Sequence, residues 1–261
     1  MTANCILERV AQTKSTNDDL LERWRAGELI DPVARIAHKQ TAGKGRAGRT
    51  WLARPEDSIC FSLAFPFKRK PAELTGLSLL VGLAVISGIA QAYDLSEAAL
   101  HQAGLRLKWP NDLLLNNAKL GGILIEGGQA KSGDPTWMII GIGMNLRNAN
   151  AIAASLGNQA DLKISALDQL LPSQATSPDV EYLWLKLLAS LEYHLGEFDQ
   201  HALARRRGLG RPAPVFEGPQ RGGQVGRALY RVHQLEDLAD LFAEDRALQR
   251  CGPRDGAFPF P

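Results

Sequence analysis

The stretch KLGGILIEGGQAKSGDPTWMIIGIGMNL, from Lys119 to Leu146, contains two apolar runs separated by a segment rich in turn residues. Residues 119–127 and 136–146 have the composition of strands, and the GGQAKSGDP segment at 127–135 supplies glycine, aspartate and proline. Two such runs joined by a turn-rich connection are typical of an antiparallel hairpin. A hairpin in the middle of the chain favours an antiparallel or mixed sheet over a parallel, doubly wound one.

The flanking sequence supplies further strands and helices in runs rather than in strict alternation. The segment SICFSLAF at 58–65 alternates apolar and small residues with the period of a half-buried strand. The segment STNDDLLERWRAGE at 15–28 has capping residues before its apolar face and a glycine where a helix can end. We therefore predict an α+β fold, with a mixed, mainly antiparallel sheet and helices packed on it. The other predicted elements are strands at 33–40 and 105–110 and helices at 72–93 and 178–200.

Length, charge and cysteine content exclude several classes of protein. The chain has 261 residues and a formal net charge of +2, which gives no global case for binding nucleic acid or membranes. Cys5, Cys60 and Cys251 are far apart and lack the spacing of a zinc site, so we predict neither disulfides nor a metal site. No signal peptide is visible, and the apolar run at 77–93 is too short and glycine-interrupted to span a bilayer. We predict a cytoplasmic protein without a membrane partner.

The segment TAGKGRAGRTW at 41–51 fits the G-x-G-x-x-G pattern and nearly fits a Walker A loop. Both motifs open a helix, whereas the sequence after this loop contains Pro55 and leads into an alternating strand. Lys44, Arg46 and Arg49 lie among the glycines, which let backbone N–H groups approach an anion closely. The loop therefore predicts a phosphate cradle followed by a strand, and a solvated basic turn is the alternative.

Several blocks, in this order, resemble the biotin protein ligases. The most specific part of the resemblance is KWPND at 108–112 followed by KLGGILIE at 119–126. The glycine loop alone would be a weak match. The resemblance covers about residues 6–200, and it implies the biotin/lipoate ligase catalytic fold, which is similar to class II aminoacyl-tRNA synthetases. Lys44 and Ala47 depart from it, since arginine is common at both positions. The remaining blocks are STN at 15–17, the glycine loop with its flanks at 40–51, and GIGMNL at 141–146.

The resemblance implies ATP-dependent attachment of biotin to one lysine of a biotin carboxyl carrier protein, through biotinyl-5′-AMP. The carrier would belong to acetyl-CoA carboxylase or a related carboxylase, and the cofactors would be ATP and Mg²⁺ bound with the nucleotide. The catalytic pattern begins within about ten residues of Met1. We therefore expect a monofunctional ligase without the DNA-reading N-terminal domain that some members carry, and no nucleic-acid partner.

Adenylation brings an anionic carboxylate to an anionic phosphate, so fixed cations lower its barrier. By resemblance, the predicted catalytic residues are Lys119, Arg46 and Asp112, and Asp112 would orient the incoming amine or a metal-bound water.

Biotin's neutral ureido ring needs neutral polar partners, although residues 15–17 also form an ordinary helix cap. Trp109 is a candidate apolar wall. The predicted biotin-binding residues are Ser15, Thr16, Asn17, Gln40, Lys44, Gly45, Arg46, Lys119 and Gly122. The predicted ATP-binding and adenylate-binding residues are Gly43, Lys44, Gly45, Arg46, Gly48, Arg49, Trp51, Asn111 and Asn145. For Trp51, a role in the core is favoured over stacking on adenine.

The C-terminal part of the chain changes character. From Leu203 onward it holds ten arginines, eight glycines and six prolines but no lysine, and it does not resemble the SH3-like barrel that normally ends the family. Such composition is typical of a disordered tail, and the abrupt change raises the hypothesis of a reading-frame shift in the gene. We predict a biotin ligase catalytic domain at 1–200 and an atypical segment at 201–261.

Three other functions remain open from the sequence. A lipoate or octanoate ligase or transferase has a related fold, but it lacks this type of glycine loop and has less use for neutral polar residues such as Gln40. A biotin-responsive regulatory protein without catalysis would need the DNA-reading domain. A nucleic-acid-binding protein acting through the arginine-rich tail is the third alternative.

Overall fold

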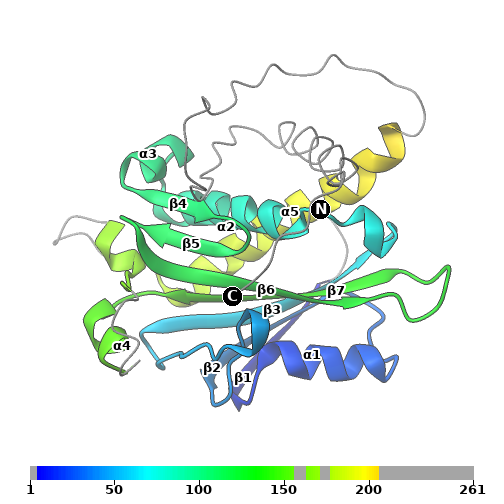
Figure 1. Cartoon of the computed structure of the whole chain (residues 1–261), viewed down its shortest axis with the longest axis horizontal. Helices are drawn as coiled ribbons and strands as arrows, with labels where there is room; N and C mark the ends of the chain where they lie inside the picture. Colours follow the sequence, from blue (N-terminus) through cyan, green and yellow to red (C-terminus); the bar gives the residue numbers. More distant parts are fainter. Residues whose placement is uncertain (1–4, 156–162, 171–176, 206–261) are drawn as a thin grey trace, which may run out of the picture.

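The computed structural model describes residues 5–155, 163–170 and 177–205. Its strands are β1 (Ile6–Thr13), β2 (Val33–Gln40), β3 (Ser58–Phe67), β4 (Leu105–Lys108), β5 (Asp112–Leu115), β6 (Ala118–Gly128) and β7 (Thr136–Asn145). They form one seven-stranded sheet in the order β1-β2-β3-β7-β6-β5-β4 (Figure 1). Strands β1 and β2 are parallel, and the other neighbouring pairs are antiparallel. The predicted α+β class is therefore confirmed.

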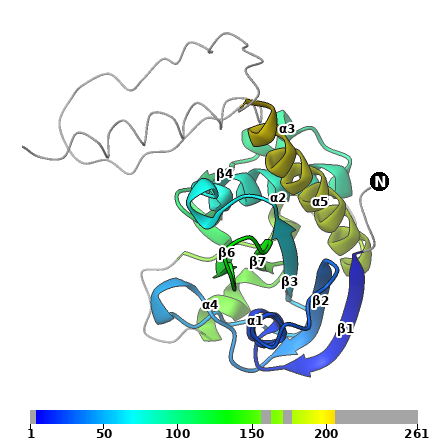
Figure 2. The same cartoon turned by 90° about the vertical axis from the view of Figure 1, so that its right-hand side faces the viewer.

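Helices cover both faces of this sheet. They are α1 (Thr16–Arg25), α2 (Leu77–Tyr93), α3 (Glu97–Gln102), α4 (Ala149–Ser155) and α5 (Val180–Arg205). Figures 1 and 2 show α2 and α5 packed together on one face and α1 on the other, where it contacts β3 and β7. A Cβ added to Gly88 of α2 would lie 2.9 Å from the Cα of Leu187 in α5, so this glycine lets the two helices approach closely.

The alternation of β3 distributes its side chains between two apolar cores. Ile59, Phe61 and Leu63 are buried in the larger core with α2 and α5. Ala64 belongs to the smaller core beneath α1. Because successive residues of a strand point to opposite faces, the intervening Ser62 lies on the α1 side, where it is fully buried. The Ser62 hydroxyl therefore lies beside the polar side chains at the start of α1.

Several predicted elements are confirmed, with shifted boundaries. The β6–β7 hairpin pairs Gly121 with Met144 through to Gly128 with Trp137. The helix predicted at 72–93 begins at Leu77, because Gly76 adopts a positive φ of 85° that separates it from a short 3-10 turn. The strand predicted at 105–110 ends at Lys108.

The structure also contains elements that the sequence did not predict, namely β1, β5, α3 and α4. Helix α5 continues past the predicted boundary at residue 200. The composition-based predictions for 206–261 lie outside the described residues. No helix in the described part of the chain has the length and apolarity that a bilayer crossing requires.

Candidate functional site

A cavity of about 740 Å³ lies between the start of α1, the end of β2, the glycine loop and the inner strands β3, β6 and β7. Its volume is in the usual range for small-molecule sites. The structure brings together in this lining every predicted biotin-binding residue and the predicted catalytic Asp112. It also brings together the predicted adenylate-binding residues except Gly43 and Gly48. The lining further includes Cys60, Ser62, Lys108, Gly141 and Gly143, which were not among the predicted site residues.

Neutral polar side chains form a connected network on the α1 side of the cavity. Gln40 Oε1 accepts a hydrogen bond from the backbone N–H of Thr16 at 2.8 Å and lies 3.1 Å from the Thr16 hydroxyl. The hydroxyls of Thr16 and Ser62 are 2.7 Å apart, and Ser62 donates to Asn17 Oδ1 at 2.7 Å. Thr16, Asn17 and Ser62 are each almost fully buried. Since buried polar groups need partners, this network fixes the orientation of the side chains that a neutral ligand would meet.

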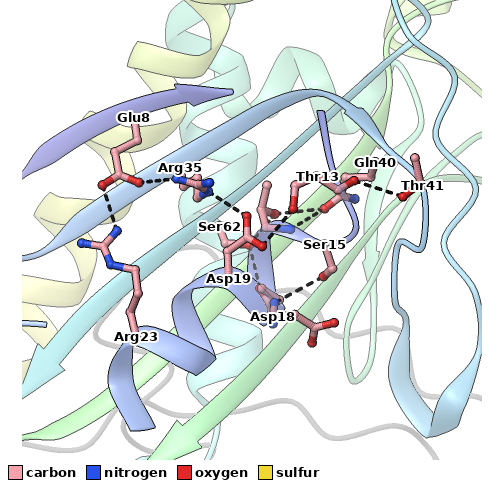
Figure 3. Close-up of polar contacts among 12 residues, drawn as sticks. Glu8, Thr13, Ser15, Asp18, Asp19, Arg23, Arg35, Gln40, Thr41 and Ser62 are labelled. Carbon is pink, nitrogen blue, oxygen red and sulfur yellow. Dashed lines mark hydrogen bonds and ion pairs between the residues drawn. The ribbon is translucent and has the colours of Figure 1, made fainter. Parts of the chain in front are cut away.

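Ion pairs hold α1 against β1 and β2 (Figure 3). Glu8 bonds to Arg23 at 2.8 Å and to Arg35 at 2.7 Å, and Arg35 bonds in turn to Asp19 at 2.8 Å. Burial alone would raise the pKa of Glu8, but the bonds from Arg35 and Arg23 hold it below its ordinary value. Ser15 caps the helix by accepting from the backbone N–H of Asp18. The segment at 15–17 is therefore both a helix cap and a rigid mount for the network.

The glycine loop is a tight hairpin rather than a helix start. Gly43 accepts from the N–H of Trp51 at 2.9 Å, and Gly45 donates to Arg49 at 2.7 Å. Its helical part is a three-residue 3-10 turn, Arg46–Gly48, after which the chain runs on to β3. The exclusion of a dinucleotide-binding or Walker A loop is thereby confirmed, because both would require an α-helix here.

The three cations of the loop differ in their surroundings. Arg46 donates to Asn111 Oδ1 at 3.2 Å. The side chain of Arg49 has no bonded partner in the part of the chain that the structure describes. Lys44 lines the cavity, but its ammonium is bound to Asp18 at 2.7 Å, and this hydrogen bond raises its pKa. Lys44 therefore ties the loop to α1 through an ion pair. The sequence had predicted a cation that faces a phosphate and did not include this ion pair.

Lys119 lies at the opposite side of the cavity on a fixed stretch of backbone. Its Nζ is 2.8 Å from Asp112 Oδ1 and 5.8 Å from the ring centroid of Trp51. Its backbone N–H donates to Lys163 at 2.7 Å, and its carbonyl accepts from Ser165 at 2.9 Å. The backbone that carries the Lys119 ammonium is consequently fixed by two main-chain bonds to the segment 163–165.

Asn145 is buried at the end of β7 with half of its amide anchored. Its Nδ2 donates to Ser165 O at 3.0 Å and to Lys119 O at 3.4 Å. Its Oδ1 has no hydrogen-bond partner among the described residues. This leaves an acceptor at the cavity wall, where adenylate binding was predicted.

Trp109, the predicted apolar wall, is 62% exposed and stands at the edge of the site.

Trp51 forms part of the cavity floor. A Cβ added to Gly143 would lie 2.4 Å from the Trp51 ring. The indole covers a glycine of β7. This position favours a packing role for Trp51 over a role as an exposed surface on which adenine stacks.

The neighbouring Cys60 is buried, which raises the pKa of its thiol to about 12. This cysteine is therefore not a thiolate nucleophile at neutral pH.

Gly143→Ala is expected to destabilise the protein by about 1–3 kcal/mol, because the new methyl group must displace the Trp51 ring. Thermal unfolding should show a midpoint lower by about 2–4 °C per kcal/mol. Gly122→Ala is the matched control, since its Cβ would find its nearest neighbour at 3.7 Å, an ordinary contact. Equal midpoints for the two variants would contradict this account of Trp51.

Cleavage of the loop by trypsin after Lys44, Arg46 or Arg49 is expected to be fast in the free protein and slow with biotin and ATP. Glycine-rich, like-charged segments retain conformational entropy and repel themselves until an anion binds. All three residues are exposed. A time course of proteolysis followed by mass spectrometry checks this. Equal rates with and without the ligands would show that the loop is already ordered.

Comparison with known proteins agrees with this site and fold. The profile of the biotin/lipoate A/B protein ligase family matches residues 10–145, just over half of the chain. The chain therefore belongs to the biotin/lipoate A/B protein ligase family.

Its relatives include a biotin–[acetyl-CoA-carboxylase] ligase from Mycobacterium tuberculosis, 39% identical over 165 residues, which cover 62% of this chain and 58% of the relative. The bifunctional ligase/repressor BirA of Escherichia coli is 33% identical over 190 residues, which cover 73% of this chain and 53% of the relative. The chain thus spans just over half the length of these relatives.

Solved structures share the fold. A biotin protein ligase from Leishmania major in complex with biotinyl-5-AMP superposes with a TM-score of 0.59 at 24% identity, covering 86% of this chain and 88% of the other. A biotin protein ligase from Aquifex aeolicus gives a TM-score of 0.51 at 21% identity, covering 78% and 74%. The predicted biotin/lipoate ligase fold is confirmed.

Proposed function

We propose that this protein attaches biotin to a lysine of a biotin carboxyl carrier protein, through biotinyl-5′-AMP made from biotin and ATP. The observation that carries the proposal is the composition of one cavity, in which a neutral hydrogen-bonding network adjoins a group of cations. Five cations and one carboxylate are found in its described lining, namely Lys44, Arg46, Arg49, Lys108, Lys119 and Asp112. The names of the relatives, including the biotin–[acetyl-CoA-carboxylase] ligase, support the same function.

The neutral network suits the ureido ring of biotin. That ring offers one carbonyl and two N–H groups and carries no charge, so it is best bound by neutral amides and hydroxyls. Gln40, Thr16 and Ser62 supply these groups within hydrogen-bonding distance of one another. Apolar strand residues such as Ile123 and Ile142 also line the cavity, and they would contact the bicyclic ring and the valeryl chain.

The cations suit the adenylation step. An oxygen of the biotin carboxylate attacks the α-phosphorus of ATP, and the bond to pyrophosphate breaks. Negative charge on the phosphoryl oxygens would be stabilised by Arg46, whose planar fork fits such anions, and by Lys119. In the second step the neutral ε-amine of the carrier lysine attacks the acyl carbon. AMP then leaves and the amine loses a proton. Asp112, which is paired with Lys119, would orient that amine.

Mg²⁺ is expected to arrive with the nucleotide rather than to occupy a protein site. Asp112 is the single carboxylate among the described lining residues, and it is paired with Lys119 at 2.8 Å. No group of three or more metal-binding side chains occurs in the described residues. A Mg²⁺ ion would thus be held mainly by triphosphate oxygens and water, and it would neutralise charge on the departing pyrophosphate.

Incubation with labelled biotin, ATP–Mg²⁺ and a biotin carboxyl carrier domain tests the proposal. Label is expected on one carrier lysine, and it should disappear when ATP is omitted or that lysine is changed to arginine. A carrier domain that stays unlabelled while the protein binds biotin would refute ligation.

The second candidate is a lipoate or octanoate ligase of the same family. It predicts label on a lipoyl domain with labelled lipoate or octanoate instead. The network at Gln40 and Ser62 favours biotin, because a straight acyl chain has no ureido group to occupy it.

A further inference from the structure

A chain of hydrogen bonds runs from the cavity to a carboxylate outside it. We propose that Glu126 is a positioning residue for biotin: it fixes the amide of Asn17 and thereby sets the direction of the chain through Ser62 and Thr16. The inference rests on the proposed function and adds a residue that does not touch the ligand. Asn17, Ser62 and Thr16 line the cavity, whereas Glu126 does not.

Contacts on three sides hold the Asn17 amide. Its Nδ2 donates to Glu126 Oε2 at 2.9 Å, and its Oδ1 accepts from Ser62 at 2.7 Å. A Cβ added to Gly141 would lie 2.3 Å from Asn17 Oδ1, so the amide lies directly against the backbone of β7. Asn17 is 3% exposed and has no room to find other partners. The orientation of the Asn17 amide is therefore set by the hydrogen bond that Glu126 accepts from its Nδ2.

Counting protons gives the chain one direction. An ionised carboxylate only accepts hydrogen bonds, so Asn17 must turn its NH₂ toward Glu126 and its oxygen toward Ser62. Ser62 has one hydroxyl proton, which it gives to Asn17. In the 2.7 Å contact between Ser62 and Thr16, the donor must then be Thr16. The Thr16 hydroxyl has one proton, so it cannot also donate to Gln40 Oε1, which lies 3.1 Å away. Gln40 Oε1 keeps the backbone N–H of Thr16 at 2.8 Å as its donor.

This direction determines what the site offers to a ligand. With their protons committed, the oxygens of Thr16, Ser62 and Asn17 present lone pairs, which can accept from ureido N–H groups. Gln40 Oε1 is held by Thr16, so its NH₂ group is the donor for the ureido carbonyl. A glutamine at position 126 can donate as well as accept. Glu126→Gln would let the chain reverse and turn an Asn17 N–H toward the position of a ligand N–H.

The test is a double-mutant cycle between Glu126→Gln and Ser62→Ala, with biotin and desthiobiotin titrated by calorimetry. Each single variant is expected to weaken biotin binding about tenfold, the scale of one lost hydrogen bond at a polar site. Desthiobiotin should lose about the same factor, because it keeps the ureido group. The double variant should bind about as weakly as either single variant, since both changes interrupt the same chain. The matched control is Glu28→Gln, the same chemical change at an exposed position.

Two further readouts separate positioning from folding. ATP binding and the adenylation rate at saturating biotin should stay within about twofold of the native values in Glu126→Gln, and Glu126→Asp should recover part of the affinity. Additive losses in the cycle would overturn the proposal, as would an equal loss of ATP affinity with a lowered unfolding temperature. Failure of the native protein to bind biotin would instead count against the proposed function itself.

Discussion

Lys119→Met is expected to slow the formation of biotinyl-AMP by about 10²- to 10³-fold, the usual scale for removing one preorganised electrostatic group. Methionine keeps the length and apolar stem of the side chain but removes the charge. The ammonium is held 2.8 Å from Asp112, and the side chain is 20% exposed. Main-chain bonds to Lys163 and Ser165 fix the strand that carries it. Little reorganisation is therefore needed when charge develops on the phosphate.

The rate is measured by ATP–pyrophosphate exchange at saturating biotin, beside biotin binding by calorimetry. Biotin affinity should change much less than the rate, because the neutral network lies on the α1 side of the cavity. Lys119→Arg should restore only part of the rate, since a guanidinium is wider than an ammonium. Lys131→Met, at an exposed position in the β6–β7 turn, should exchange at the native rate. Native exchange by Lys119→Met would remove Lys119 from the mechanism.

The fold could be predicted where local signals were strong. The β6–β7 hairpin has turn residues between two apolar runs, and β3 alternates along its length, so both were identifiable. Strand β1 was not, because it is an edge strand whose residues are all exposed or half-buried, and it therefore lacks a clear apolar alternation. Strand β5 has four residues, too few to show a period. Its pairing with β4 and β6 is a tertiary effect.

The site could be predicted where contiguous motifs supply its residues. Residues 15–17, 40–51 and 108–126 contain most of the cavity lining. The polar partners that orient them were missed, because they come from distant parts of the chain. Ser62 bonds to Thr16 across 46 positions, and Glu126 bonds to Asn17 across 109. One signal was available for Ser62, since a polar residue in an otherwise apolar strand implies a buried partner.

Lys44 illustrates the same limit for charges. From the sequence, Arg46 was predicted to be catalytic, and all three loop cations were predicted to contact the adenylate. In the folded chain the ammonium of Lys44 is bound to Asp18, 26 positions away, whereas Arg46 bonds to the neutral Asn111. The charge of Arg46 is therefore left for a ligand, while that of Lys44 is partly compensated. The ion pair that compensates Lys44 is visible only in the tertiary structure.

Arg46→Ala is therefore expected to release biotinyl-AMP about ten- to a hundredfold faster, with much less effect on biotin alone. Hydrogen bonds to charged groups contribute about 1.5–3 kcal/mol each, and the bonds lost here would face the phosphate. The guanidinium is aimed by Asn111 Oδ1 at 3.2 Å, and the Asn111 amide is itself anchored to Ile123 O at 2.9 Å. No acidic side chain pairs with Arg46 in the described part of the chain.

Release is measured by forming labelled biotinyl-AMP on the enzyme and chasing it with unlabelled ligand. Leaked adenylate should also label lysines of a bystander protein without selectivity, because the mixed anhydride reacts with any accessible amine. Arg46→Lys should leak at an intermediate rate, since it keeps the charge but loses the planar fork, and the exposed Arg25→Ala should behave as the native protein. If Arg46→Ala instead lost affinity for biotin and adenylate equally, Arg46 would belong to the biotin pocket. Retention of the intermediate would then depend on Lys119 and Arg49.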